Sequence, residues 1–155
     1  MTAQNAAPRY RPNVAGILRN GAGEILIGER LHFPGSWQFP QGGVDEGEER
    51  EAALRREMEE EIGLLPGDYA ILDSRGPYRY LFEEGRQKRG YDGQEQYYFL
   101  LDLLGPPSRV HVATEHQEFR RTAWIAPGEF QLSWLPAFKL EVYKAVFRDF
   151  FGIAL

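Results

Sequence analysis

The chain has 155 residues, of which 43% are hydrophobic and 14% aromatic, enough apolar material for one well-packed core. It contains no Cys, which excludes disulfides, a thiolate nucleophile and a Cys-ligated zinc. The formal net charge is −5, whereas proteins held to nucleic acid by bulk electrostatics are usually basic. An acidic protein can still bind phosphates when divalent metal ions supply the positive charge.

The N-terminal segment is polar and lacks the apolar stretch of a signal peptide. No apolar run in the sequence approaches the ~20 residues of a membrane span. We therefore expect a cytoplasmic protein without a membrane partner. We also expect a single domain over residues 1–155, with a flexible N-terminus at residues 1–9.

The first half of the chain predicts a β-hairpin followed by a helix. Two apolar runs, 14–18 and 24–29, flank Asn20-Gly21, which is the strongest short-range hairpin signal. A short extended piece at 37–40 precedes an acidic stretch with helical signals. Asp45 and Glu48 have a spacing close to that of a capping box, so we predict a helix from about Glu48 to Ile62.

The second half of the chain predicts further strands and a C-terminal helix. The polar, Gly-rich stretch 83–93 is predicted to be an exposed loop. From Pro136 to about Phe151, apolar residues recur at helical spacing. Strands are predicted at 70–74, 78–82, 96–103, 110–112 and 123–125. This order indicates an α/β or α+β fold with a mixed sheet between helices.

Glu is the commonest residue between Gly42 and Leu64, although like charges at helical spacing destabilise a helix. With Leu54 taken as the origin, Met58 lies at about +40° around the helix. Glu61 then lies at about −20° and Glu57 at about −60°, beside this apolar stripe rather than opposite it. One interpretation is a site for Mg²⁺ or Mn²⁺, which prefer oxygen ligands. The alternative is a solubilising face with i,i+4 Glu/Arg pairs.

The same stretch resembles the signature of the Nudix hydrolases, G-x5-E-x7-R-E-U-x-E-E-x-G-U, where U is a bulky apolar residue. The matching residues are Gly42, Glu48, Arg56, Glu57, Met58, Glu60, Glu61, Gly63 and Leu64. Other segments are similar to one subgroup, which contains the asymmetrical dinucleoside tetraphosphate hydrolases and the bacterial RNA 5′-pyrophosphohydrolases. These segments are R-P-N-V at 11–14, S-W-Q-F-P-Q-G-G at 36–43, G-Q-E-Q-Y-Y-F-L at 93–100, E-F at 118–119 and F-K-L-E-V-Y at 138–143.

This resemblance implies the Nudix fold, an α/β/α sandwich around a mixed β-sheet. It implies a metal-dependent pyrophosphohydrolase with two to three Mg²⁺ ions, Mn²⁺ being an alternative. The substrate would be a nucleotide or dinucleoside polyphosphate such as diadenosine tetraphosphate, the 5′ end of triphosphorylated RNA, or both. Both a monomer and a homodimer are compatible with the resemblance.

The resemblance also implies roles for individual residues. Metal ligation and catalysis would involve Glu57, Glu60, Glu61 and Glu118, with Gly42 in the metal site and Arg56 orienting the carboxylates. The proton of the attacking water would pass either to a carboxylate of the signature or to Glu118. Glu48 is expected to be partly structural, because nine residues separate it from Glu57 by roughly half a turn.

Substrate contacts are expected at further positions, each with an ordinary alternative. Arg11, Arg30 and Lys139 match phosphate-contacting positions of the subgroup, and the alternative for each is a surface cation. Tyr78 and Tyr80 are candidates for stacking on a base, which contributes roughly 1–3 kcal/mol per base in single-strand binders. Core packing is the alternative for both. The loop cations Arg86, Lys88 and Arg89 are candidates for contact with a substrate tail.

Two positions depart from the subgroup. Glu95 and Tyr97 stand where RNA pyrophosphohydrolases tend to carry Lys, which weakens the prediction of a long RNA substrate. The alternatives are a non-catalytic nucleotide-binding module and a Nudix hydrolase for nucleoside triphosphates or ADP-ribose. An isoprenoid diphosphate isomerase of the same fold is disfavoured, since that chemistry relies on a Cys that is absent here.

Overall fold

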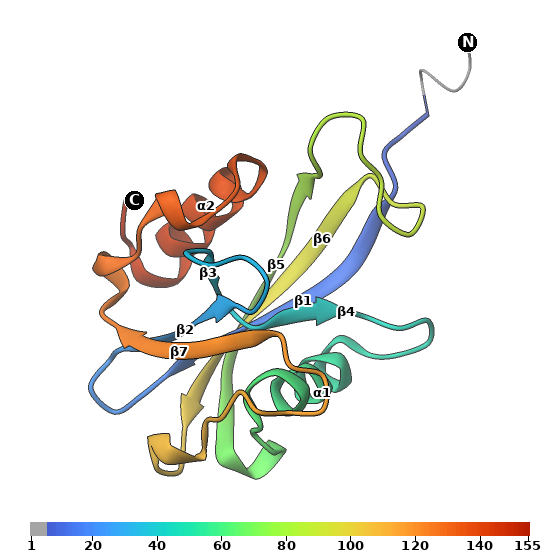
Figure 1. Cartoon of the computed structure of the whole chain (residues 1–155). Helices are drawn as coiled ribbons and strands as arrows, with labels where there is room; N and C mark the ends of the chain where they lie inside the picture. The colour runs from blue at the N-terminus through green and yellow to red at the C-terminus, as the bar shows by residue number, and fades with distance from the viewer. Residues whose placement is uncertain (1–5) are drawn as a thin grey trace.

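The computed structural model describes residues 6–155, in which seven strands form one mixed sheet with a helix on each side (Figure 1). The sheet order is β3-β2-β1-β6-β5, with β4 paired to β1 and β7 paired to β2. Only β1 and β6 are parallel among the pairs of this part of the chain. The elements are β1 (Tyr10–Arg19), β2 (Ile25–Arg30), β3 (Trp37–Gln38), β4 (Gln41–Gly43), α1 (Arg50–Ile62), β5 (Tyr69–Leu81), β6 (Gly93–Leu103), β7 (Phe119–Ile125) and α2 (Leu140–Phe151).

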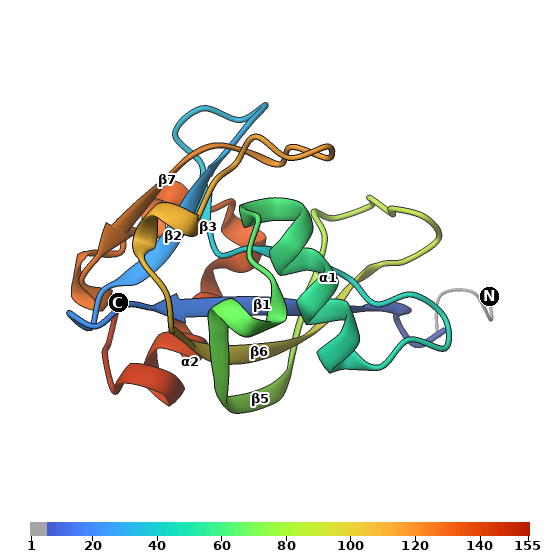
Figure 2. The ribbon, with the colours of Figure 1, turned by 90° about the horizontal axis from the view of Figure 1, so that it is seen from below.

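The central strand β1 is buried on both faces because each face carries a helix. Val14 and Leu18 pack in the cluster that contains α1, whereas Ala15 and Ile17 pack in the cluster that contains α2. Successive side chains of a strand point to opposite faces, so a near-continuous apolar run suits this position. Figure 1 shows α2 above and α1 below the central strands, and Figure 2 shows α1 in front of β1.

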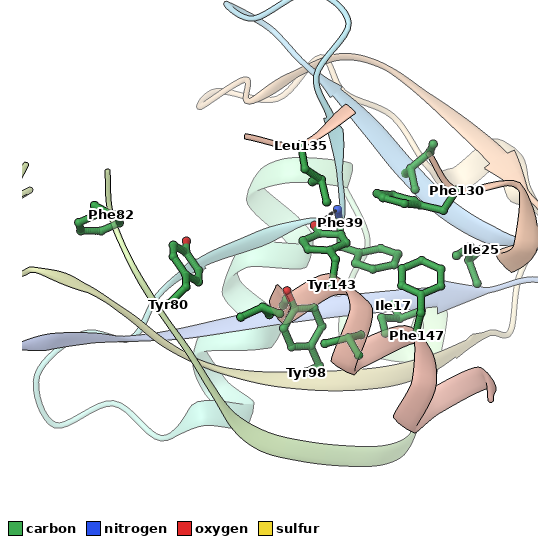
Figure 3. Packing of buried hydrophobic residues seen from close by; sticks show 14 residues of the cluster. Ile17, Ile25, Phe39, Tyr80, Phe82, Tyr98, Phe130, Leu135, Tyr143 and Phe147 are labelled. Carbon is green, nitrogen blue, oxygen red and sulfur yellow. Dashed lines mark hydrogen bonds between the residues drawn. The ribbon is translucent and has the colours of Figure 1, made fainter. Parts of the chain in front are cut away.

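Aromatic rings fill the space between the sheet and α2 (Figure 3). Phe39, which follows β3, stacks on Tyr143 of α2 with ring centroids 5.5 Å apart and planes inclined by 4°. The ring centroids of Phe147 and Phe130 lie 5.8 and 6.2 Å from that of Phe39. These rings come from segments far apart in the sequence, so they join the strands near the site to the C-terminal helix.

The predicted hairpin, acidic helix and C-terminal helix are confirmed, with shifts at their ends. Helix α1 begins at Arg50, two residues after the predicted start, and its N-cap residue Glu49 makes no side-chain cap bond. Asp45 and Glu48 instead close a turn before the helix, in which the Asp45 N–H donates to Glu48 Oε1 at 3.0 Å. Gly63 adopts the left-handed conformation expected of a C-cap, with φ 71°.

Four strand predictions need correction. The strands predicted at 70–74 and 78–82 form one strand, β5, whose pairing with β6 shifts register twice. The strand predicted at 110–112 is wrong, because this segment covers the end of α1 and the His111 N–H donates to the Ile62 carbonyl at 3.0 Å. Strand β7 begins at Phe119, four residues earlier than predicted, because it pairs along β2.

The predicted loop at 83–93 is confirmed except that Gly93 already belongs to β6. Of the N-terminal segment expected to be flexible, residues 1–5 lie outside the described residues. Arg9, at its end, donates its N–H to Asp92 Oδ2 at 2.8 Å. Neither helix in residues 6–155 is long and apolar enough to cross a membrane.

Candidate active site

Two glycines of β4 allow charged side chains to lie directly against this strand. A Cβ at Gly42 would overlap the carboxyl group of Glu57 from α1. A Cβ at Gly43 would overlap the guanidinium of Arg11 from β1. Gly42 is therefore required by space beside the Glu57 carboxylate, and the structure brings Arg11 to the same strand.

Two carboxylates of α1 are buried on its packing side. Glu57 is 9% exposed and Glu61 is 3% exposed. Glu61 Oε1 accepts a long hydrogen bond of 3.4 Å from the Gln41 N–H. Burial raises the pKa of Glu61 well above its usual range. A hydrogen bond with Glu57 and the negative charges of Glu57 and Glu118 raise it further. This pocket of acids is destabilised when all its members are ionised, and a cation placed among them would relieve the repulsion.

Arg56 organises the outer side of this cluster. Its guanidinium donates to Glu57 Oε1 at 2.7 Å, to both oxygens of Glu48 at 2.8 and 3.0 Å, and to the Gly43 carbonyl at 2.8 Å. A carboxylate oxygen of Glu60 lies 3.7 Å from the same group. The bond to Arg56 holds the pKa of Glu48 below its usual value, as expected for a carboxylate with a structural partner. Arg56 thereby fixes the orientation of Glu57.

Glu118 joins the cluster from the loop before β7. Burial and the charge of Glu57 raise the pKa of Glu118, while Arg30 and His32 oppose this shift. Two contacts hold its loop in place. The Leu31 N–H donates to the Glu118 carbonyl at 2.9 Å, and the Thr114 hydroxyl donates to the carbonyl of Glu60 on α1.

Of the predicted cations, Arg30 lies close enough to Glu118, and Lys139 close enough to Arg30, for their charges to interact. Lys139 is 9% exposed and donates to Gln38 Oε1 at 3.0 Å. Burial lowers the pKa of Lys139 to about 8, helped by repulsion from Arg30 and Lys88. Burial also lowers the pKa of Arg30, whereas Glu118 raises it. Among residues 6–155, neither cation takes part in an ion pair.

The two tyrosines predicted to contact a base are both engaged in packing. Tyr80 is 8% exposed, donates to Gln94 Oε1 at 2.7 Å, and stacks on Phe138. Tyr78 donates to Asp149 Oδ2 at 2.8 Å and so ties β5 to the end of α2. The structure places Tyr80 beside Arg30. Tyr78 instead lies beside Asp149, and not beside the buried carboxylates of α1.

Comparison with known proteins decides the family. A sequence model described as NUDIX domain matches residues 9–146. The chain belongs to the NUDIX family. The predicted Nudix fold and the predicted class of enzyme, a hydrolase of pyrophosphate bonds, are both confirmed.

Similar proteins cover nearly the whole chain. An RNA pyrophosphohydrolase of Sphingopyxis alaskensis is 38% identical over 147 residues, which is 91% of this chain and 92% of the relative. One from Wolbachia pipientis subsp. Culex pipiens is 39% identical over 152 residues, or 93% and 91% of the two chains. Among solved structures, the Escherichia coli dihydroneopterin triphosphate pyrophosphohydrolase aligns with a TM-score of 0.68 at 17% identity, covering 92% of this chain and 97% of its own. A C. elegans Ap4A hydrolase aligns with a TM-score of 0.60 at 19% identity, covering 92% and 99%.

Nudix hydrolases in general depend on divalent metal ions, and the donor set of this site suits such an ion. The donors are hard carboxylate oxygens, and the pKa of Glu61 is raised first by burial and further by Glu57 and Glu118 nearby. Within the described part of the chain, no three acidic or imidazole groups stand together closely enough to enclose an ion. Glu57 is paired with Arg56 through Oε1 at 2.7 Å, and a carboxylate held in this way still has a second oxygen that can bind an ion.

The two departures from the Nudix subgroup both carry local partners. Glu95 accepts from Arg79 Nε at 2.7 Å, and the Arg50 guanidinium lies 3.6 Å from the ring centroid of Tyr97. Tyr97 packs in the cluster of α1, whereas the neighbouring Tyr98 packs in the cluster of α2. The charge of Glu95 is therefore balanced on the α1 side of the sheet.

Sequence reasoning missed Gln38, Phe33 and Thr114. Gln38 is a buried polar residue whose amide oxygen holds Lys139. Phe33 is 54% exposed and has the Arg30 guanidinium 3.9 Å from its ring centroid. Only Gln38 had a sequence signal, as a polar residue between the apolar Trp37 and Phe39.

Proposed function

We propose that this Nudix hydrolase removes pyrophosphate from the 5′ end of triphosphorylated RNA. The observation that carries the proposal is the group of acids Glu57, Glu61 and Glu118, which lie close enough to affect one another's ionisation. The cation Arg30 lies near Glu118, and a second cation, Lys139, lies near Arg30. Relatives named RNA pyrophosphohydrolase are 38–39% identical over more than nine tenths of the chain and support the substrate. Diadenosine tetraphosphate is the second candidate, because the same charges suit any nucleoside with a polyphosphate chain.

A polyphosphate chain resists hydrolysis because its negative oxygens repel an incoming nucleophile. In this proposal Arg30, Lys139 and Arg11 bind those oxygens and hold the chain in place. Two to three Mg²⁺ or Mn²⁺ ions, held by Glu57, Glu60, Glu61, Glu118 and Gly42, would supply neutralising charge and acidify the attacking water. A carboxylate of the signature or Glu118 takes the proton from that water. Arg56 keeps Glu57 oriented through its 2.7 Å hydrogen bond.

The charge of Lys139 gives this proposal a pH signature. Its pKa is lowered to about 8, so Lys139 loses its positive charge as the pH rises through this value. Phosphate binding then weakens, and KM rises while kcat changes less. Lys139→Arg, whose charge persists at alkaline pH, removes this rise.

The pairing of Glu95 with Arg79 balances the negative charge at this position, whereas the Lys residues of the subgroup are still absent at 95 and 97. We also propose that the chain acts as a single domain and that it is located in the cytoplasm. Both a monomer and a homodimer remain compatible with the site.

The decisive experiment compares four substrates under the same Mg²⁺ concentration. These are 5′-triphosphorylated RNA, diadenosine tetraphosphate, ADP-ribose and simple nucleoside triphosphates, ranked by kcat/KM. We expect RNA first and diadenosine tetraphosphate second, with all turnover abolished by EDTA. A preference for ADP-ribose or nucleoside triphosphates of about tenfold would contradict the proposal. Tight binding without turnover of any substrate would indicate a nucleotide-binding module instead.

A further inference from the structure

Strand β4 lies directly beside the two buried carboxylates of α1. On the α1 side of the sheet, a Cβ at Gly42 would overlap the carboxyl group of Glu57. Successive side chains of a strand point to opposite faces, so the side chain of the preceding residue, Gln41, points to the α2 side. The backbone N–H of Gln41 donates to Glu61 Oε1 at 3.4 Å. The position of β4 therefore affects the surroundings of both acids.

Strand β4 receives little support from the rest of the sheet. It is three residues long, and among the strand pairs of residues 6–155 it takes part only in the one with β1, at three positions. A segment with so few hydrogen-bonded neighbours opens locally at little cost unless side chains hold it in place. A contact from a side chain to β4 is therefore of direct importance for the acid site.

The buried side chain of Gln96 on β6 supplies such a contact. Gln96 is 3% exposed, and its amide nitrogen donates to Gln41 Oε1 at 3.1 Å and to Asn13 Oδ1 at 3.0 Å. Its amide oxygen accepts from the Tyr98 hydroxyl at 3.0 Å. An amide side chain has two N–H donors, so both donors and the oxygen of Gln96 are used. The bond to Gln41 reaches from β6 past β1 to β4.

A buried amide network can also serve the fold alone, by fixing the register of strands. Two observations favour a role in the site. Strands β1 and β6 already pair directly along their length, with Asn13 opposite Gln96, so they do not need the amide to join them. In addition, the network ends at Gln41, the same residue whose backbone N–H meets Glu61.

We propose that Gln96 is a positioning residue for the metal site. By holding the side chain of Gln41 on the α2 side of the sheet, it fixes the position of β4 and of Gly42 relative to the acids of α1. Gln96 thus acts through Gln41 and not through contact with an ion or a substrate. The inference rests on the metal site of the proposed function. Hydrogen-bonding partners that orient the groups of a metal site typically contribute about 10–100-fold to metal affinity or activity.

The test uses Gln96→Met, which has a similar size but cannot donate a hydrogen bond. Gln41→Ala removes the other end of the same bond at a half-buried position, so a second variant is at hand if the first fails to fold. The control is Asp68→Ala, which removes another buried polar side chain. Its partners are the Leu65 N–H and Arg109, and neither lies on β4.

Binding of Mn²⁺ to each metal-free protein is measured by isothermal titration calorimetry, because this readout does not depend on catalysis. Circular dichroism checks that each variant is folded. In parallel, kcat and KM on triphosphorylated RNA are measured over a range of Mg²⁺ concentrations. The double variant Gln96→Met/Gln41→Ala completes a double-mutant cycle.

We expect the Kd for Mn²⁺ to rise about tenfold in each single variant, and the Mg²⁺ concentration that gives half-maximal kcat to rise by a similar factor. The KM for RNA should change by less than about twofold, since the cations Arg30 and Lys139 are untouched. The double variant should bind Mn²⁺ as weakly as either single variant, because both changes remove one bond. Asp68→Ala should bind Mn²⁺ as the wild type does.

The outcomes separate this inference from the proposed function. Wild-type affinity for Mn²⁺ in the folded Gln96 and Gln41 variants would overturn the inference and leave the proposed function standing. Additive losses in the double variant, or an equal loss in Asp68→Ala, would also overturn it, because the effect would then not pass through the bond between the two side chains. If the wild type itself binds no Mn²⁺ and hydrolyses RNA in EDTA, the metal site of the proposed function is wrong, and Gln96 has no such role.

Discussion

The two helices that cover the sheet bury different chemistry. Helix α2 packs with Val142, Tyr143, Val146 and Phe147, all apolar or aromatic. Helix α1 buries Leu54 and Met58 in the same way, but also the carboxylates of Glu57 and Glu61. Burying a charge without a partner destabilises the fold, so the packing side of α1 stabilises the protein less than that of α2. In return, α1 supplies the carboxylates of the proposed metal site.

The strongest test of this contrast removes one acid from α1. Glu60→Gln should lower kcat by roughly 10²–10⁴-fold with the fold retained, because the amide cannot ligate a metal ion or accept a proton equally well. The measurement is kcat with Mg²⁺ together with far-UV circular dichroism. Glu59→Gln is the matched control, since Glu59 is the exposed neighbour of Glu60. Near-normal turnover of Glu60→Gln would remove Glu60 from the site.

The converse change in α2 should affect stability far more than chemistry. Phe147→Ala deletes a ring that is 0% exposed and stacks 5.8 Å from Phe39. We expect the free energy of unfolding to fall by about 3–5 kcal/mol in urea titrations. The folded fraction should retain kcat within a small factor. A large loss of kcat at full folding would mean that the two helices are not separable in this way.

A positioning contact links the loop of Glu118 to α1. Thr114→Val removes the hydroxyl that donates to the Glu60 carbonyl, so the position of Glu118 relative to α1 should be less well fixed. We expect kcat to fall about tenfold with little change in KM. Thr114→Ser keeps the hydroxyl and should restore kcat. If serine and valine behave alike, the methyl group rather than the hydrogen bond matters.

The smallest expected effect is a change in the free energy of unfolding with pH, caused by the buried carboxylate of Glu61 in α1. Burial, together with Glu57 and Glu118, raises the pKa of Glu61 above its usual value, so the folded state binds its proton more tightly than the unfolded state. Its contribution to stability is therefore complete below about pH 4 and is lost as the pH rises through the raised value. Glu61→Gln should stabilise the metal-free protein by on the order of 1 kcal/mol near pH 8 and not at all near pH 4.

Urea titrations at the two pH values, in the presence of EDTA, check this prediction. Saturating Mg²⁺ should reverse the order, because an ion bound at Glu61 stabilises the wild type more than the variant. A variant that is less stable than the wild type at alkaline pH without metal would show that Glu61 is not under electrostatic strain.

Much of the fold and of the proposed catalytic cluster could be predicted because the signals are local. Asn20-Gly21 predicts a hairpin through turn geometry, and the angular positions of Glu57 and Glu61 follow from helix periodicity. The spacing of the signature then identifies Arg56 as their partner. The structure confirms the first two directly and shows Arg56 hydrogen-bonded to Glu57 at 2.7 Å.

The remaining features depend on partners distant in the sequence. The segment 110–112 reads as a strand, yet it covers the end of α1, where His111 satisfies a helix carbonyl. Tyr78 reads as a base platform, yet its hydroxyl is taken by Asp149 of α2. Glu95 is predicted only as a position that lacks the Lys of the subgroup, yet the structure pairs its charge with Arg79. In each case the residue type is the same, and its neighbour decides its role.

The family, the acidic helix and the proposed role of its carboxylates follow from local spacing, because the positions of residues along one helix set which side chains share a face. The groups that stand opposite that face depend on how the whole chain packs. Gly42 admits the Glu57 carboxylate, and Arg30, Lys139 and Glu118 arrive from other segments. The physical reason is that the interaction of charges depends on distance and burial, which are properties of the packed chain and not of its local pattern.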